Sequence, residues 1–166
     1  MTTKRRFSTR LAFAFAIATA VSTAVAPAIA ADDDAAGIKL GIPGNVQATA
    51  AVGVVLRVKE VVAAEDVTLV TVSASYSGET SFLELAYSDS GTYLQDENGQ
   101  KFPLRSPEDN PNLRISRGDT MQGRLVFLGR VAPESKKIRL VFNEGRDGGD
   151  TSGPGLSVDV PLTPKG

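Results

Sequence analysis

The 166-residue sequence contains no cysteine, no histidine and no tryptophan. The lack of cysteine excludes disulfide bonds and thiolate-ligated zinc, and it argues against a lipid-modified N-terminal cysteine. The lack of histidine excludes an imidazole general base, a Ser-His-Asp triad and histidine-ligated metals. We therefore expect neither a cofactor nor an enzymatic activity, and the length favours one folded domain.

Residues 1–30 have the pattern of a cleavable signal peptide. The chain opens with a basic head that contains Lys4, Arg5, Arg6 and Arg10. An uncharged, largely apolar stretch of about 15 residues follows, shorter than the roughly 20 residues that span a bilayer as a helix. Ala28-Ile29-Ala30 then forms a small-residue cleavage site. We expect an exported protein, periplasmic or extracellular, with no membrane span after cleavage and with 14 basic against 19 acidic residues.

The remaining sequence predicts short β-strands joined by turns. Val70, Val72, Ala74 and Tyr76 alternate with hydroxyl side chains, which is the two-residue period of a half-buried strand. Strands are expected over residues 52–62, 67–77, 82–87, 92–95, 100–104, 113–116, 120–131, 137–143 and 156–162. Asn98-Gly99 tolerates positive φ angles and predicts a hairpin between two of them.

Eight or nine short strands in a chain of this size favour an all-β fold. We expect a two-sheet antiparallel immunoglobulin-like sandwich over residues 50–166, preceded by a flexible lead-in over 31–49, with a small barrel as the alternative. Without tryptophan or a disulfide, the core is expected to combine aliphatic side chains with four aromatic ones, namely Tyr76, Phe82, Phe127 and Phe142.

Three segments carry a resemblance to a known family: Tyr93 to Phe102 (YLQDENGQKF), Arg117 to Phe127 (RGDTMQGRLVF) and Ile138 to Asn143 (IRLVFN). Over roughly residues 50–143 the chain resembles secreted bacterial immunoglobulin-like domains of unknown function, a family related to a small secreted mycobacterial antigen. Its members have a D-x-x-G hairpin, a G-x-x-x-x-G-x-L-V-F strand and a final L-x-F strand. The resemblance implies the sandwich fold and secretion but no particular activity.

Positive charge is concentrated in one part of the chain. Residues 101–139 contain nine basic and four acidic side chains, whereas the rest of the sequence after residue 30 contains five basic and fifteen acidic ones. If strands 120–131 and 137–143 pair, one outer face carries an apolar centre and a basic rim. The centre would be Val126, Leu128 and Val141, and the rim Arg124, Arg130, Lys137 and Arg139.

Such an arrangement is typical of a docking surface, and we hypothesise that it binds an envelope protein or an anionic envelope polymer. The alternative is that another segment covers the aliphatic side chains and that the charges only increase solubility. Nucleic acid is not expected as a partner, because the chain without residues 1–30 is acidic and exported.

Two further motifs lie in predicted turns. Arg117-Gly118-Asp119 is the tripeptide that integrins bind, but it falls where the fold requires a turn, and we interpret it as that turn. The glycine-rich loop 143–155 contains Glu144, Asp147 and Asp150, which suggest an alternative calcium-binding or small-ligand site. The same composition suits an ordinary hairpin connection. The sequence thus predicts an exported, non-enzymatic binding or scaffolding module of the bacterial envelope or secretome.

Overall fold

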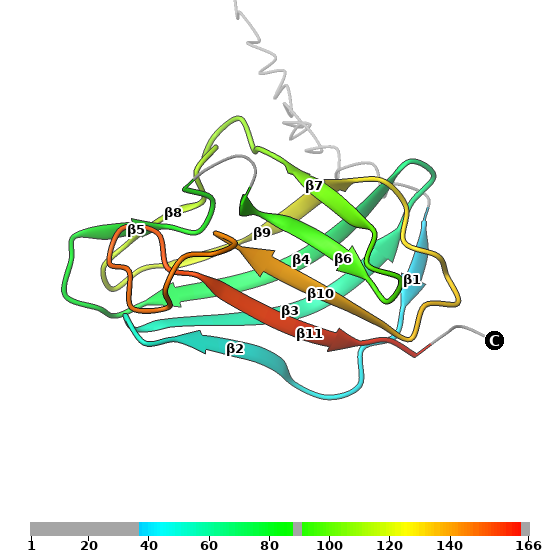
Figure 1. Cartoon of the computed structure of the whole chain (residues 1–166), viewed down its shortest axis with the longest axis horizontal. Helices are drawn as coiled ribbons and strands as arrows, with labels where there is room; N and C mark the ends of the chain where they lie inside the picture. The colour runs from blue at the N-terminus through cyan, green and yellow to red at the C-terminus, as the bar shows by residue number, and fades with distance from the viewer. Residues whose placement is uncertain (1–36, 88–90, 164–166) are drawn as a thin grey trace, which may run out of the picture. The chain divides into compact units, whose positions relative to one another are not determined.

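The computed structural model describes residues 37–87 and 91–163, which form β-strands and turns and no α-helix (Figure 1). The strands are β1 (Ile38–Leu40), β2 (Val46–Ala50), β3 (Val54–Ala63), β4 (Val67–Tyr76), β5 (Phe82–Glu84), β6 (Tyr93–Asp96), β7 (Lys101–Arg105), β8 (Arg114–Ser116), β9 (Thr120–Leu128), β10 (Lys137–Phe142) and β11 (Leu156–Pro161). In this part of the chain, no helix has the length and apolar character of a membrane span. The predicted signal peptide, residues 1–30, lies outside the described residues.

Nine of the strands form one antiparallel sheet that curls until its two ends meet. Its order is β1-β3-β4-β9-β7-β6-β10-β11, with β2 also paired to β3, while β5 and β8 form a separate small sheet. Two backbone hydrogen bonds of 2.8 and 3.3 Å join Gly41 to Thr163 and so connect the two ends of the curled sheet. In Figure 1, β6, β10 and β11 lie in front of β4 and β9, so the curl produces two layers. The all-β antiparallel prediction is confirmed, with one continuous sheet supplying both layers.

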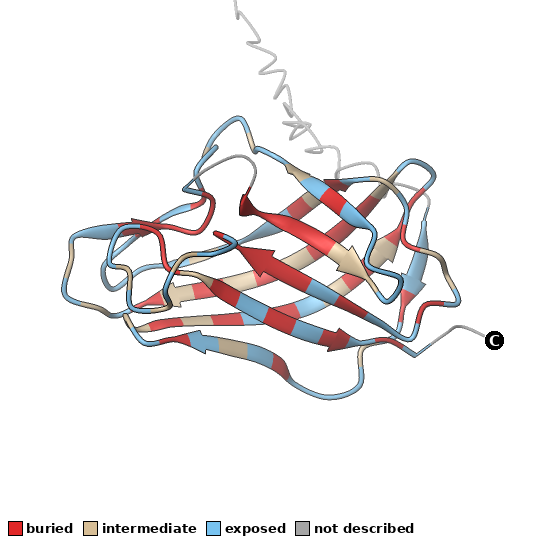
Figure 2. Cartoon of the chain, viewed as in Figure 1, coloured by how far each residue is buried: buried red, intermediate tan, exposed pale blue. Residues whose placement is uncertain are grey.

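The core lies between the two layers. Figure 2 shows buried and exposed residues alternating along β11, as the two-residue period requires, and buried residues alternating with intermediate or exposed ones along β3 on either side of its bulge. Fully buried side chains from both layers meet there, including Leu56, Val70, Val72, Phe127, Ile138, Leu140, Phe142 and Val160. Burial of this apolar surface is the main stabilising contribution to the fold. Tyr76 is also buried, as predicted.

The prediction for Phe82 is wrong. Phe82 belongs to the small β5-β8 sheet, in which Leu83 and Ile115 are buried in the core but 39% of the Phe82 surface is exposed. The guanidinium of Arg114 lies 3.9 Å from the centre of its ring. Its place in an apolar run suggested burial, but the side chain packs against a cation at the surface.

Each of the nine predicted strands overlaps an observed strand, but the predicted flexible lead-in over 31–49 is wrong from residue 38 onward. Both β1 and β2 pair with β3. Leu40 and Val46 are buried at 1% and 7% exposure, so these short strands contribute to the core. Pro43 and Gly44 divide the apolar pattern into pieces too short to show a period.

The predicted pairing of strands 120–131 and 137–143 is also wrong. β9 pairs with β4 and β7, whereas β10 pairs with β6 and β11. The chain turns away from β9 at Gly129, which has a φ of 123°. The Thr68 hydroxyl donates to the Gly129 carbonyl at 2.9 Å and accepts from the Val131 amide at 2.9 Å. Residues 129–136 therefore cross to the other layer instead of closing a hairpin.

Two predicted turns are confirmed. Gly99 has a φ of 86° and closes the β6-β7 hairpin, where the Asp96 carboxylate accepts hydrogen bonds from two backbone amides. Gly118 also has a φ of 86° and lies in the turn between β8 and β9. Both angles fall in the left-handed region, where glycine carries no steric penalty. Arg117 and Asp119, which flank Gly118, are exposed.

Candidate functional site

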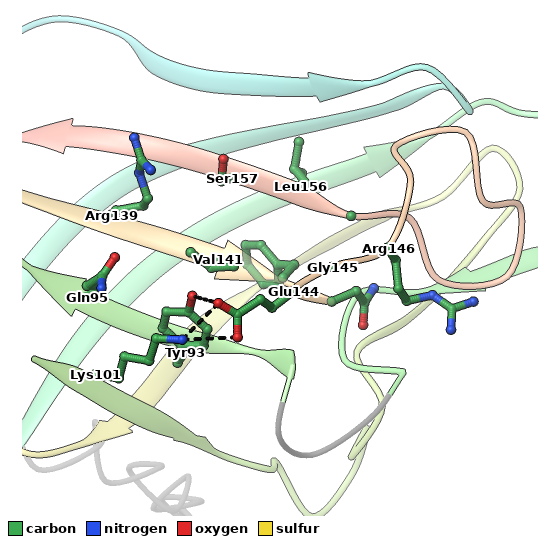
Figure 3. A pocket seen from close by; sticks show the side chains of 13 residues that line it. Tyr93, Gln95, Lys101, Arg139, Val141, Glu144, Gly145, Arg146, Leu156 and Ser157 are labelled. Atoms are coloured by element: carbon green, nitrogen blue, oxygen red, sulfur yellow. Dashed lines mark hydrogen bonds and ion pairs between the residues drawn. The ribbon is translucent and has the colours of Figure 1, made fainter. Parts of the chain in front are cut away.

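A polar groove of about 550 Å³ lies on the outer face of the layer formed by β7, β6, β10 and β11 (Figure 3). The strand register builds its floor from two cross-strand rows, because directly opposed residues lie side by side on one face of a sheet. One row contains Lys101, Gln95, Arg139 and Asp159. The next contains Tyr93, Val141 and Ser157. A smaller hollow of about 210 Å³ extends the groove past Gln95 and Arg139 toward the β6-β7 hairpin.

One end of the groove holds a cluster of Tyr93, Lys101 and Glu144. The Tyr93 hydroxyl donates to Glu144 Oε1 at 2.5 Å, and Lys101 Nζ lies 2.8 and 3.0 Å from the two Glu144 oxygens. The same Nζ lies 4.1 Å from the centre of the Tyr93 ring, a cation–π contact. Figure 3 shows the three side chains converging, with Glu144 supplied by the loop after β10.

These contacts set the ionisation states of the cluster. The hydrogen bonds from Lys101 and Tyr93 hold the pKa of Glu144 below its usual range, and the bond to Glu144 raises the pKa of Lys101. Burial, followed by the hydrogen bond to Glu144, raises the pKa of Tyr93. At neutral pH the cluster therefore contains a carboxylate, an ammonium and a neutral phenol.

Along the groove, Arg139 and Asp159 form a bidentate ion pair. Arg139 Nε and Nη2 donate to the two Asp159 oxygens at 2.7 and 3.0 Å. These bonds lower the pKa of Asp159 and raise the pKa of Arg139. At the rim, Arg146 Nη2 lies 2.6 Å from Asp150. The three cations that line the groove thus each have a carboxylate partner.

The loop 143–155 connects β10 to β11, and the structure does not bring its three acidic side chains together. Glu144 is bonded to Lys101 and Tyr93, as above. Asp147 Oδ1 accepts from the Gly149 amide, and Asp150 accepts from two backbone amides and from Arg146. In residues 37–87 and 91–163, no three acidic side chains are arranged to hold a metal ion. Of the carboxylates of the predicted calcium site, Asp147 and Asp150 stabilise the loop itself, and Glu144 connects the loop to β6 and β7.

The residues of the predicted docking surface lie on two separate outer faces. Arg124, Val126 and Leu128 are on β9, whereas Lys137, Arg139 and Val141 are on β10, with β7 and β6 between them. Arg130 follows β9 in the crossing segment. Leu128 is 49% exposed, but Val141 is only 8% exposed and lies in the groove floor. The prediction of a single docking surface is therefore wrong, because that surface required β9 and β10 to pair.

Sequence reasoning identified Arg139 and Val141 but missed the other residues of the groove floor. Tyr93 and Gln95 show the spacing of residues on one strand face, and so do Ser157 and Asp159. That spacing was the available signal, but it does not reveal that β6 and β11 both pair with β10. Comparisons with protein-family models, with curated proteins and with solved structures find no match to the chain. The resemblance to secreted immunoglobulin-like domains therefore stays an expectation.

Proposed function

We propose that this chain is an exported, non-enzymatic binding or scaffolding module of the bacterial envelope or secretome, built as an immunoglobulin-like sandwich. The signal-peptide pattern of residues 1–30 supports export. The two antiparallel layers, together with the three family-like segments, support the finer fold assignment. The observation that carries the binding role is the groove, in which polar side chains from four adjacent strands are held in position by ion pairs.

The charge balance of the groove favours an uncharged, hydroxyl-rich ligand such as a saccharide chain of the envelope. Hydroxyl groups can donate to free lone pairs on Asp159 and Glu144 and accept from remaining N–H groups of Arg139 without breaking an ion pair. An anionic ligand at Lys101, Arg139 or Arg146 would first have to displace a carboxylate. The six residues of β10 span roughly 20 Å, which is long enough for several sugar rings in line.

The same carboxylates favour binding over hydrolysis. A glycosidase needs one carboxylic acid whose pKa is raised so that it is protonated when it meets the substrate. The pKa values of Glu144 and Asp159 are both lowered, so neither group holds a proton near neutral pH. This supports a module that holds a saccharide and does not cleave it.

The binding proposal is tested by titrating the purified chain with uncharged glucan and N-acetylglucosamine oligomers, after an array has ranked them. Arg139→Ala should weaken binding about tenfold, since hydrogen bonds to a charged group contribute roughly 1.5–3 kcal/mol. Lys59→Ala, on the opposite layer, is the matched control and should leave binding unchanged. If no uncharged saccharide binds, or if Arg139→Ala has no effect, the ligand class is wrong.

Export is tested separately by expressing the full chain in a bacterial host and sequencing the N-terminus of the mature protein. Cleavage after Ala30 and recovery outside the cytoplasm are expected. An intact chain retained in the cytoplasm would contradict export and leave the test of the groove unaffected.

A further inference from the structure

The outer face of the opposite layer carries cations without carboxylate partners. The register places Gln47, Arg57, Ser73 and Gln122 in one cross-strand row over β2, β3, β4 and β9. The neighbouring row contains Glu60, Thr71 and Arg124. Lys59 lies at a bulge of β3, where the register shifts between Val58 and Glu60. Its Nζ reaches this face and donates to Gln122 Oε1 at 2.8 Å.

The contacts of these cations leave their charge uncompensated. Arg57 Nε donates to Gln47 Oε1 at 3.3 Å, and Lys59 also bonds to an amide, so both partners are neutral. Within the described residues, Arg57, Lys59 and Arg124 form no ion pair. The acidic residue of this face, Glu60, is paired with Lys39. We call the surface formed by Arg57, Lys59, Arg124, Thr71 and Ser73 the basic face.

The loop between β7 and β8 places one acidic residue, Asp109, next to the basic face. Asp109 and Arg124 line the same shallow hollow of about 200 Å³, but they form no ion pair in the part of the chain that the structure describes. Within the described residues, the three cations of the basic face are therefore in ion pairs with no carboxylate, although Glu60 and Asp109 lie nearby, and a partner can supply the complementary negative charge.

We propose that the basic face binds a linear, phosphate-bearing polymer. Arg57 and Arg124 lie on strands two apart, roughly 10 Å across the sheet. Between them, Lys59 reaches from β3 to Gln122 on β9, across the small side chains of Thr71 and Ser73 on β4. An extended chain can cross this flat surface. Guanidinium groups bind phosphate oxygens through two parallel hydrogen bonds, and the hydroxyl groups donate between them.

Two other polymers fit this surface less well. Single-stranded nucleic acid binds by stacking bases on aromatic side chains, but Phe82 and Tyr87, the large exposed aromatic residues in the described part of the chain, do not belong to β2, β3, β4 or β9. A protein partner needs an apolar contact centre. Among the described residues of this layer, the exposed large apolar side chains are Ile38 on β1 and Leu128 on β9. Ile38 lies opposite Ala63 and Leu128 opposite Val67, at the other end of the strands from the basic face. The proposal does not rest on the groove, and only an envelope origin of the polymer rests on the proposed export.

The experiment titrates the purified chain with long-chain inorganic polyphosphate at several salt concentrations. Three phosphate contacts should give a slope of about −2 for log K against log salt. The combined change Arg57→Ala, Lys59→Ala and Arg124→Ala should weaken binding about a hundredfold. All three side chains are exposed, so the variant should keep the wild-type unfolding midpoint. The matched control, Lys101→Ala with Arg139→Ala in the groove, should bind polyphosphate as the wild type does.

Several outcomes would overturn the proposal. Failure to bind polyphosphate at low salt, or an equal loss in the groove variant, would remove the basic face as the site. Tighter binding to poly-L-glutamate would indicate a carboxylate-rich partner, and tighter binding to single-stranded DNA would indicate nucleic acid. A large loss of polyphosphate binding on Leu128→Ser would show that contact extends to the apolar end of β9 and that the surface is assigned wrongly.

Discussion

The groove and the basic face are both cross-strand rows on outer faces of one curled sheet, yet their electrostatics differ. In the groove, Lys101 and Arg139 lie 2.7 to 3.0 Å from carboxylate oxygens. On the basic face, Arg57 and Lys59 contact amide oxygens of glutamine at 3.3 and 2.8 Å. The comparison teaches that the partner of each cation, more than the number of cations, determines which ligand a sheet face attracts.

The largest effect is expected when the basic face is given the charge balance of the groove. Gln47→Glu with Gln122→Glu places a carboxylate where Arg57 and Lys59 now contact an amide. Polyphosphate binding should weaken at least about tenfold, because two of the three charges become compensated. Gln47→Ala with Gln122→Ala is the control, and it should keep wild-type affinity in the same titration. Equal affinity of the two double variants would refute the comparison.

The reverse exchange in the groove should have an intermediate effect. Glu144→Gln with Asp159→Asn leaves Lys101 and Arg139 without their carboxylates. We expect this variant to bind polyphosphate more tightly than the wild type does. Adding Lys101→Ala and Arg139→Ala to it should abolish that gain. The gain should be a few-fold, since these side chains are about half exposed and solvent screens them. Unchanged polyphosphate affinity would mean that ion pairing does not limit what the groove binds.

A smaller effect is expected in the pH dependence of unfolding. The folded-state pKa values of Glu144 and Asp159 are lowered, so their ion pairs stabilise the fold above the ordinary carboxylate pKa of about 4. That contribution is lost as the pH falls through the lowered values. Thermal midpoints measured from neutral to acid pH should fall less steeply for the Glu144→Gln, Asp159→Asn variant than for the wild type. Parallel curves would contradict this.

The smallest effect concerns the phenol of the groove. Burial and the Glu144 hydrogen bond raise the pKa of Tyr93 above 10.0, so it should lose its proton at a higher pH than an ordinary tyrosine. Glu144→Gln should lower this pKa only in part, because burial remains. Ultraviolet absorbance titration measures the change, with Tyr93→Phe identifying the signal. A Tyr93 pKa that returns fully to its ordinary value would show that burial contributes nothing.

The strands were predictable because the alternation of apolar and polar side chains is local. Val70 to Tyr76 shows the period directly, and Asn98-Gly99 marks its own hairpin. The two faces were not predictable, because they depend on which distant strands become neighbours. Lys101 and Arg139 belong to the basic stretch 101–139, but Glu144 and Asp159 neutralise them from outside it. Arg57 and Lys59 lie outside that stretch, and they share a face with Arg124 because β4 pairs with both β3 and β9.

The two backbone hydrogen bonds between Gly41 and Thr163 also affect whether copies of the chain can associate through their strand edges. An open sheet ends in strands whose unpaired amides and carbonyls recruit strands from other molecules, which leads to aggregation. Here the segment after β1 and the segment after β11 use these groups on one another. A strand from another copy would have to break that closure before it could add at this point, which protects the molecule when it is concentrated.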